Sequence, residues 1–237
     1  MRRSLTLAFV IAAFAVPVTA SAEVVELGGG VETARAVCPD NDCAAPGKLT
    51  GYQGRSGKVA NPFLIKRSGT IVAFTVSVAR PESNQIDFFE RTYGTDPPQV
   101  RLAILRRGKR KGAKRNFRLM QQSKSYRVDK YYGSSPTFAL DKPMRVDRGR
   151  IIGITIPTWA PIFGRPTVGK NWWRASRAKG RCKDVQADVQ HNKLGDVKTY
   201  GCDYFNVRFM YTVTYIPDPK PTEKPKPTRK PKPDTGQ

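Results

Sequence analysis

The feature of this sequence that most constrains its fold is a period-two alternation of apolar and polar side chains. It is clearest in residues 204–216, where one face of an extended chain would carry Phe205, Val207, Phe209, Tyr211, Val213 and Tyr215. Shorter runs of the same kind occupy residues 70–79, 100–104 and 152–156, and Gly- or Pro-containing turns separate them. Because strand side chains point alternately to opposite faces, the pattern predicts many short antiparallel strands. We therefore expect an all-β protein, an antiparallel β-sandwich that is jelly-roll-like and forms a single domain.

Helical periodicity is weak throughout the chain. Residues 83–91 and 171–179 are each expected to hold a short helical turn or two. In residues 70–79 the alternation predicts one shared face for Val72, Phe74, Val76 and Val78.

The composition divides the chain into four parts. Residues 1–22 combine Arg2 and Arg3, an apolar run and Ala20-Ser21-Ala22, which is the pattern of a cleaved secretory signal peptide. The apolar run is short for a membrane-spanning helix, so we expect an exported protein that is not an integral membrane protein. The remaining parts are expected to be an N-terminal lead with a small Cys loop and a flexible glycine run (residues 23–47), the β-sandwich domain (residues 48–216) and a disordered, extended Pro/Lys-rich tail (residues 217–237).

Four cysteines in an exported chain favour disulfide bonds. Three pairings are possible, and we favour the two that are local in sequence, Cys38–Cys43 and Cys182–Cys202. A zinc site made of the four cysteines is the alternative, but neither pair has the C-x2-C spacing of such a site. We expect no metal and no cofactor.

The chain is strongly basic. Removal of residues 1–22 takes away two arginines and no acidic residue, which lowers the formal charge from +23 to +21. Such an excess of positive charge bears on solubility and on the choice of binding partners, and it carries no information about the fold. The polyanions outside a cell are wall polymers, acidic polysaccharides, anionic lipid headgroups and released nucleic acid, and charge alone does not choose among them.

The sharpest electrostatic feature is a basic segment, residues 106–115, which stands between two predicted strands and is therefore expected at a hairpin tip. Its basic residues are Arg106, Arg107, Lys109, Arg110, Lys111, Lys114 and Arg115. The C-terminal tail adds Lys220, Lys224, Lys226, Arg229, Lys230 and Lys232. Clustered cations of this kind suit polymers that carry phosphate, sulfate or carboxylate groups, so we interpret both elements as polyanion-binding. The alternative is a solvated loop without a ligand.

Aromatic residues give a second candidate site. Tyr131, Tyr132, Trp172 and Trp173 are expected to stack on sugar rings or nucleobases, or else to fill the core. Trp172 and Trp173 are adjacent, so they cannot both face inward from an extended segment. For Trp159, which follows a predicted strand, we expect the core.

Catalytic groups are scarce. His191, the one histidine, stands in a polar stretch with no nucleophile motif nearby, so we expect a surface side chain. Glycosidase chemistry needs two carboxylates, and Asp87 with Glu90, or Asp184 with Asp188, are conceivable pairs. Neighbouring Lys and Arg side chains would lower carboxyl pKa values, whereas a general acid needs a raised pKa. The sequence therefore argues against an enzyme and predicts no catalytic residues.

Five stretches together resemble a known group of proteins. They are GTIVAFTV (69–76), VRLAIL (100–105), FRLMQQS (117–123), TFAL (137–140) and MRVDRGRIIGI (144–154). Their order resembles the exported jelly-roll-like β-sandwich domains of high-GC Gram-positive bacteria, most of which are uncharacterised. The chain departs from that pattern at Arg150, where an acidic residue is frequent, and in the basic insert after Leu105. The resemblance implies a sandwich fold and an extracellular setting, and it implies no catalytic residue.

Three functional hypotheses follow, in this order. The first is a secreted, non-enzymatic module that binds an anionic cell-surface polymer, either a wall polymer or an acidic polysaccharide, with extracellular nucleic acid as another possible ligand. The second is a structural envelope protein that binds a protein partner. The third is a carbohydrate-active enzyme with paired carboxylates.

Overall fold

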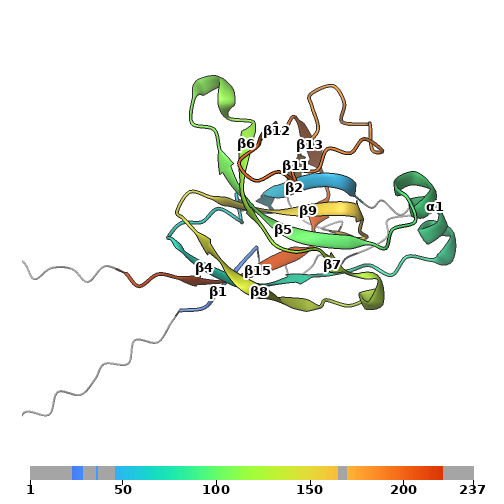
Figure 1. The fold of residues 1–237 in the computed structure, drawn as a ribbon, viewed down its shortest axis with the longest axis horizontal. Helices are drawn as coiled ribbons and strands as arrows, with labels where there is room; N and C mark the ends of the chain where they lie inside the picture. Colours follow the sequence, from blue (N-terminus) through green and yellow to red (C-terminus); the bar gives the residue numbers. More distant parts are fainter. Residues whose placement is uncertain (1–22, 29–35, 37–45, 165–169, 221–237) are drawn as a thin grey trace, which may run out of the picture.

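The computed structural model describes residues 23–28, 36, 46–164 and 170–220 of the chain, and these form an all-β sandwich (Figure 1). The larger sheet has the strand order β12 (Val197–Thr199), β6 (Asn116–Gln122), β5 (Gln99–Arg107), β9 (Ile151–Trp159), β2 (Gly47–Ser56), β11 (Trp172–Ala175) and β13 (Cys202–Phe205), with β3 (Val59–Ala60) on β2 and β7 (Tyr126–Arg127) on β5. The smaller sheet has the order β1 (Val25–Leu27), β15 (Tyr211–Pro217), β4 (Gly69–Val76) and β8 (Thr137–Val146). The pairing between the named strands is antiparallel, as the alternating pattern predicts.

Three smaller helical elements and one short strand pair complete the described fold. They are the helix α1 (Ser83–Tyr93), the 3-10 turns η1 (Lys111–Ala113) and η2 (Asp129–Tyr131), and the pair β10 (Phe163–Gly164) with β14 (Arg208–Phe209). The prediction of a helical turn near residues 83–91 is confirmed, because α1 covers that stretch. The prediction for residues 171–179 is wrong, because β11 occupies its first half and pairs with strands on both sides.

The main core lies between the two sheets. Phe74 and Val76 of β4 face Leu102, Ile104 and Ile154 of the larger sheet, and all five side chains are buried. The larger sheet also carries a second apolar cluster on its outer face, made of Tyr52, Ala103, Leu105, Phe117, Leu119, Ile151 and Tyr200. Its central strands are therefore buried on both faces, which explains why consecutive residues of β5 and β9 are apolar.

The alternation in β4 is interrupted by a β-bulge. Strand β15 pairs Thr214 with Ala73 and Tyr215 with Ile71, so Val72 has no partner in the ladder. The bulge turns Ile71 into the core, where it is 0% exposed, and leaves Val72 only half-buried. The prediction that Val72 shares a face with Phe74, Val76 and Val78 is therefore wrong, whereas those three residues are buried together.

The long predicted strand over residues 204–216 is divided into β13, β14 and β15. Asn206 has φ +61°, in the left-handed region that Asn tolerates, and it ends β13. The break shifts the alternation of β13 by one residue relative to β15. The Phe205 side chain therefore points to the opposite face and is 65% exposed rather than in the core. Tyr211, Val213 and Tyr215 of β15 are buried as predicted.

Both ends of the described chain belong to the smaller sheet. Strand β1 pairs with β15, which brings part of the expected N-terminal lead into the sandwich. At the other end Pro217 pairs with Gly69, and Asp218 receives two hydrogen bonds of 2.6 Å from the guanidinium of Arg145. The residues that follow Lys220, and the glycine run at 29–30, lie outside the described residues. Of the helices in the described ranges, none has the length and apolarity needed to cross a membrane.

Candidate functional site

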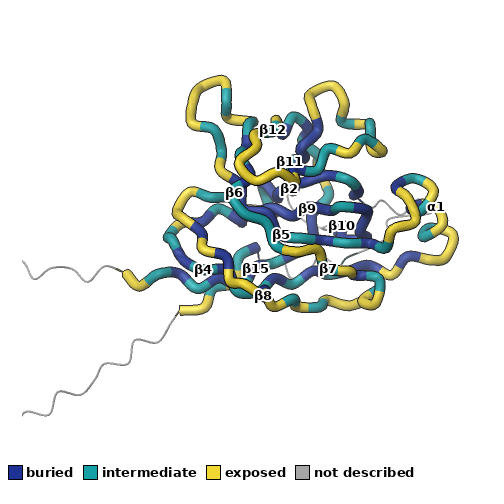
Figure 2. Tube along the Cα trace, in the orientation of Figure 1, coloured by how far each residue is buried: buried dark blue, intermediate teal, exposed yellow. Residues whose placement is uncertain are grey.

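The basic segment 106–115 forms the tip of the β5–β6 hairpin, as predicted. Arg106 pairs with Arg118 and Arg107 with Phe117, and the Gly108 amide donates to the Asn116 carbonyl at 2.8 Å to close the tip. The turn η1 lies within it. Figure 1 shows the tip projecting beyond the larger sheet, and Figure 2 shows that it is exposed. The tip is thus a folded projection held by backbone hydrogen bonds.

Four side chains on this tip, which we call the tip bases, are exposed to solvent: Lys109, Arg110, Lys111 and Lys114. Arg106 is exposed as well. Within the described part of the chain, no carboxylate forms an ion pair with any of them. Cations gathered on one projection without counter-charges attract anions from solution.

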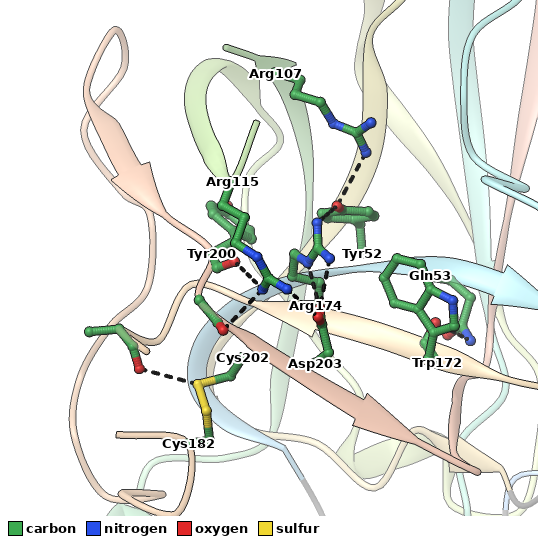
Figure 3. A network of polar contacts seen from close by, with 12 residues as sticks. Tyr52, Gln53, Arg107, Arg115, Trp172, Arg174, Cys182, Tyr200, Cys202 and Asp203 are labelled. Atoms are coloured by element: carbon green, nitrogen blue, oxygen red, sulfur yellow. Dashed lines mark hydrogen bonds and ion pairs between the residues drawn. A yellow bond between two sulfur atoms is a disulfide. The ribbon is translucent and has the colours of Figure 1, made fainter. Parts of the chain in front are cut away.

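The two remaining basic residues of the segment turn back onto the sheet and join a third arginine. We call Arg107, Arg115 and Arg174 the arginine cluster (Figure 3). The Tyr52 hydroxyl accepts hydrogen bonds from Arg107 Nη2 at 3.3 Å and from Arg174 Nη1 at 3.2 Å. Asp203 accepts from Arg174 Nε at 2.5 Å and from Arg115 Nη2 at 2.7 Å.

The register of the sheet explains why these side chains meet. Arg174 of β11 lies directly opposite Asp203 of β13, so both point to the outer face of the larger sheet. Arg107 lies over the ring of its cross-strand neighbour Phe117, with the guanidinium carbon 5.5 Å from the ring centroid. Arg115 stands at the base of the tip and also donates to the Gly201 carbonyl at 3.1 Å.

Two of the three guanidinium groups in the arginine cluster, those of Arg174 and Arg115, contact the carboxylate of Asp203. Burial raises the pKa of Asp203, but its hydrogen bonds to Arg174 and Arg115 outweigh burial and hold that pKa below the ordinary value. Burial likewise lowers the pKa of Arg174, and the contacts with Asp203 and Tyr52 raise it overall. Both shifts favour the charged forms of Asp203 and Arg174, and the cluster holds three arginines against this one carboxylate.

The adjacent tryptophans point to opposite faces, as predicted for an extended segment. Trp173 is 3% exposed and stacks on Tyr204 in the main core, with ring centroids 4.3 Å apart. Trp172 lies half-buried on the outer face, where the Arg174 guanidinium carbon is 5.1 Å from its ring centroid. Its ring packs on Gly54, at which an added Cβ would come within 2.0 Å of the indole. Trp159 is in the core as expected, against Phe89 of α1.

Phe205 lies on the same outer face as Trp172. The two residues are cross-strand neighbours in the β11–β13 pair, and the Arg174–Asp203 contact two residues along confirms which face they share. Phe205 is the most exposed of the large apolar residues in the described ranges.

Tyr131 and Tyr132 do not join this site. They lie in and directly after η2, between β7 and β8, far from the hairpin tip in Figure 1. Tyr131 is 38% exposed and meets Phe138 edge to face. Tyr132 packs against the core, and burial, with the charges of Asp129 and Glu90, raises its pKa to about 12.

The prediction of a surface position for His191 is wrong. The side chain is 0% exposed, with Nδ1 3.3 Å from the Tyr200 hydroxyl and Nε2 2.9 Å from the Asp196 carbonyl. The His191 amide donates to the Thr50 hydroxyl, which draws this polar segment onto the outer face of the larger sheet. Both ring nitrogens are thereby engaged in structural contacts.

The carboxylates considered as catalytic pairs have ordinary surroundings. Asp184 forms an ion pair with Arg181, Asp188 accepts a hydrogen bond from Gln190 at 3.1 Å, and Asp87 is exposed on α1. Among the described residues no group of histidine, cysteine and acidic side chains has the arrangement of a metal site.

The predicted Cys182–Cys202 disulfide is confirmed, with the two Cα atoms 5.4 Å apart. It ties the loop before β12 to β13, next to the arginine cluster. Cys38 and Cys43 lie outside the described residues. So do the tail residues Lys224, Lys226, Arg229, Lys230 and Lys232, while Lys220 is exposed at the end of the described chain.

Sequence reasoning missed Tyr52, Arg174, Asp203 and Phe205. A signal was available in two short runs, because Trp172 and Arg174 alternate with core residues, as do Asp203 and Phe205. Their juxtaposition depends on the pairing of β11 with β13, which joins residues as distant in the chain as Arg174 and Asp203.

The described structure thus belongs to the class of all-β sandwiches, with a basic hairpin tip and an arginine cluster on the outer face of one sheet. No protein-family model, curated protein or solved structure matches the chain.

Proposed function

We propose that this protein is a secreted, non-enzymatic module that binds an anionic polymer at the cell surface. The observation that carries the proposal is the folded, projecting hairpin tip with its exposed tip bases, which form no ion pair with the described carboxylates. A polymer with regularly spaced phosphate, sulfate or carboxylate groups can place several of them near such a tip at once. Each contact releases counter-ions, so the binding should weaken steeply with salt.

The arginine cluster and the tail add further positive charge to the molecule. Arg107 and Arg115 connect the tip to the cluster, and the tail begins at β15 on the other sheet. Figure 1 shows the hairpin tip and the end of β15 well apart in the view. Two separated basic elements on one molecule would engage a long polymer at two places. Binding at both places raises the overall affinity above that of either element alone.

Export is part of the proposal and rests on two features. The first is the signal-peptide pattern of residues 1–22, and the second is the Cys182–Cys202 disulfide, since such bonds persist in oxidising compartments. Retention at the cell surface would follow from the polymer contact itself.

The test is co-sedimentation of the mature chain, residues 23–237, with purified cell envelope over a salt series. One variant replaces the tip bases Lys109, Arg110, Lys111 and Lys114 with Ser and keeps Arg107 and Arg115, which contact the sheet. A second variant ends at Lys220, so that the Arg145–Asp218 contact is retained. We expect each to weaken binding and to reduce the salt slope by roughly one unit for each cation that no longer meets the polymer.

The matched control removes the same charge elsewhere. Lys58, Lys130, Lys142 and Lys193 are exposed lysines distributed over other parts of the surface, and their change to Ser is expected to affect binding much less than loss of the tip bases. An equal effect of both variants would mean that only the net charge matters. Binding that is indifferent to salt would contradict the proposal and direct attention to a specific envelope protein as partner.

A further inference from the structure

We propose that the outer face of β11 and β13 binds a pyranose ring that bears its own acidic group, so that the polymer is an acidic polysaccharide of the uronate type. We call this surface the aromatic–arginine face and define it by Trp172, Phe205 and the arginine cluster. The inference rests on the proposed function and narrows its ligand class.

The aromatic part consists of two side chains that the sheet holds in place. Trp172 is fixed by Gly54 beneath its ring, where no Cβ intervenes, and by the Arg174 guanidinium beside it. Phe205, directly across the strand pair, is 65% exposed. The exposed phenyl ring of Phe205 is unfavourably hydrated, and the half-buried indole of Trp172, which lies over Gly54 of β2, adds a second apolar surface on the same face of the sheet.

The charged part lies beside the Trp172 ring. The guanidinium carbon of Arg174 is 5.1 Å from the Trp172 ring centroid, and Asp203 joins Arg174 to Arg115. The Arg115 side chain is 46% exposed, compared with 14% for Arg174. Arg115 is therefore the member that is accessible to a ligand carboxylate, while Arg174 is held mainly by Asp203 and Tyr52 (Figure 3).

The Arg174 guanidinium lies beside Trp172, and Arg115 is bound to the same Asp203 carboxylate, so positive charge borders the aromatic surface, which favours a uronate over a nucleotide. In a uronate the carboxylate is attached directly to a ring carbon, so a ring stacked on Trp172 or Phe205 presents its charge at the ring edge. In a nucleotide the sugar separates the stacking base from the phosphate. A polyphosphate has no ring, and it would use the tip bases alone.

The tryptophans also provide a direct readout. Trp159 is 1% and Trp173 3% exposed, and the third tryptophan, Trp172, is half-buried on the proposed face. Quenching of fluorescence by acrylamide therefore reports mainly on Trp172. We expect polygalacturonate oligomers to protect it from quenching and polyphosphate to leave it accessible.

The affinity test uses polygalacturonate oligomers, single-stranded DNA and polyphosphate as probes against the full mature chain. Trp172→Ala and Phe205→Ala are each expected to weaken polygalacturonate binding by about tenfold and to leave polyphosphate binding unchanged. Phe88→Ala is the matched control, since Phe88 is an exposed phenylalanine, 46% exposed, on α1. Phe205 is so exposed that its removal leaves the fold intact, and circular dichroism checks both variants.

The possible outcomes separate this inference from the proposed function. If both aromatic variants bind polygalacturonate like the wild type, the inference is wrong, and the proposed function stands as long as loss of the tip bases weakens binding. If they weaken DNA binding instead, the face is a nucleic-acid surface and the inference is again wrong. If the wild type binds none of the three probes, the inference and the proposed function are both overturned.

Discussion

At the scale of single residues, His191 makes the stability of the fold depend on pH. Its imidazole is fully buried between the Tyr200 hydroxyl and the Asp196 carbonyl. Lys198 lies on the same segment, and the Gln122 side chain of β6 donates a hydrogen bond to the backbone carbonyl of His191. Burial lowers the pKa of His191, and the charge of Lys198 acts in the same direction, against the Asp196 contacts, which raise it. The neutral imidazole is thus the form that the folded protein favours.

A lowered pKa in the folded state fixes the sign of the pH dependence. Above the unfolded-state pKa of about 6.5 the histidine is neutral in both states, so its contribution to stability is fully present there. As the pH falls below that value the unfolded chain takes up the proton first, and stability decreases until the folded-state pKa is passed. We therefore expect the urea concentration at the denaturation midpoint to decrease as the pH is lowered from about 7.5 to about 5.

The control for this prediction is His191→Asn, which removes the titrating group. That variant should be less stable at neutral pH, because it loses buried hydrogen bonds, and its stability should depend less on pH over the same interval. A wild-type midpoint that rises toward acid pH would contradict the assignment. Urea denaturation followed by tryptophan fluorescence measures both proteins.

At the scale of elements, the loop between β11 and β12 is held by a covalent bond and by one buried arginine. The guanidinium of Arg177, 2% exposed, donates to the carbonyls of Asp184, Val185 and Gly47. The disulfide Cys182–Cys202 closes the same loop over a sequence separation of 20. Together they keep this loop folded beside the arginine cluster.

Removal of the disulfide should destabilise the protein by about 3 kcal/mol, because the unfolded chain regains the freedom of the closed loop. The double variant Cys182→Ser with Cys202→Ser tests this in urea. Arg177 and its carbonyl contacts remain, so we expect the variant to fold and to bind at low temperature. An unchanged unfolding midpoint would show that the loop is already constrained in the unfolded state.

The same scale shows how far sequence patterns reach. Period-two alternation located the strands around residues 100–104 and 152–156 and the basic hairpin between β5 and β6, because these depend on local side-chain order. It failed at Val72 and Phe205, where a bulge and a left-handed Asn206 change the phase of the strand. A phase change of one residue exchanges the two faces of a strand, and the alternation of apolar and polar residues does not show where it occurs.

The candidate site shows the same division. The exposed tip bases follow from a charge run between two strands, so the sequence sufficed for them. The meeting of Arg115, Arg174 and Asp203 requires the register of β11 with β13 and the approach of the hairpin base. Such contacts between distant segments are set by the packing of the whole sheet, which a pattern within one segment does not contain.

At the scale of the whole molecule, the point at which the sandwich gives way to the tail can be tested by truncation. Pro217 is still paired with Gly69, and the Asp218 amide donates to the Ser68 carbonyl at 2.8 Å. A chain that ends at Lys220 should therefore melt at the wild-type temperature. One that ends at Ile216 should melt lower, because it lacks the Arg145–Asp218 ion pair and the end of the ladder.

Differential scanning calorimetry at fixed salt compares the two truncated chains with the wild type. If the chain ending at Lys220 is itself destabilised, residues 221–237 contribute to the folded sandwich, and the binding test above needs a different tail variant. In that case charge-neutralising substitutions of the tail lysines would replace the truncation.

The position of β15 has a consequence for the order in which the strands of the smaller sheet can pair during folding. This last strand lies between β1 and β4, with Tyr215 opposite Val25 and Val213 opposite Phe74. A chain that emerges from a ribosome or a translocation channel with its N-terminus first holds β1 and β4 long before their shared neighbour is available. The smaller sheet can close only after β15 has emerged, so its closure is a late step in the folding of the chain.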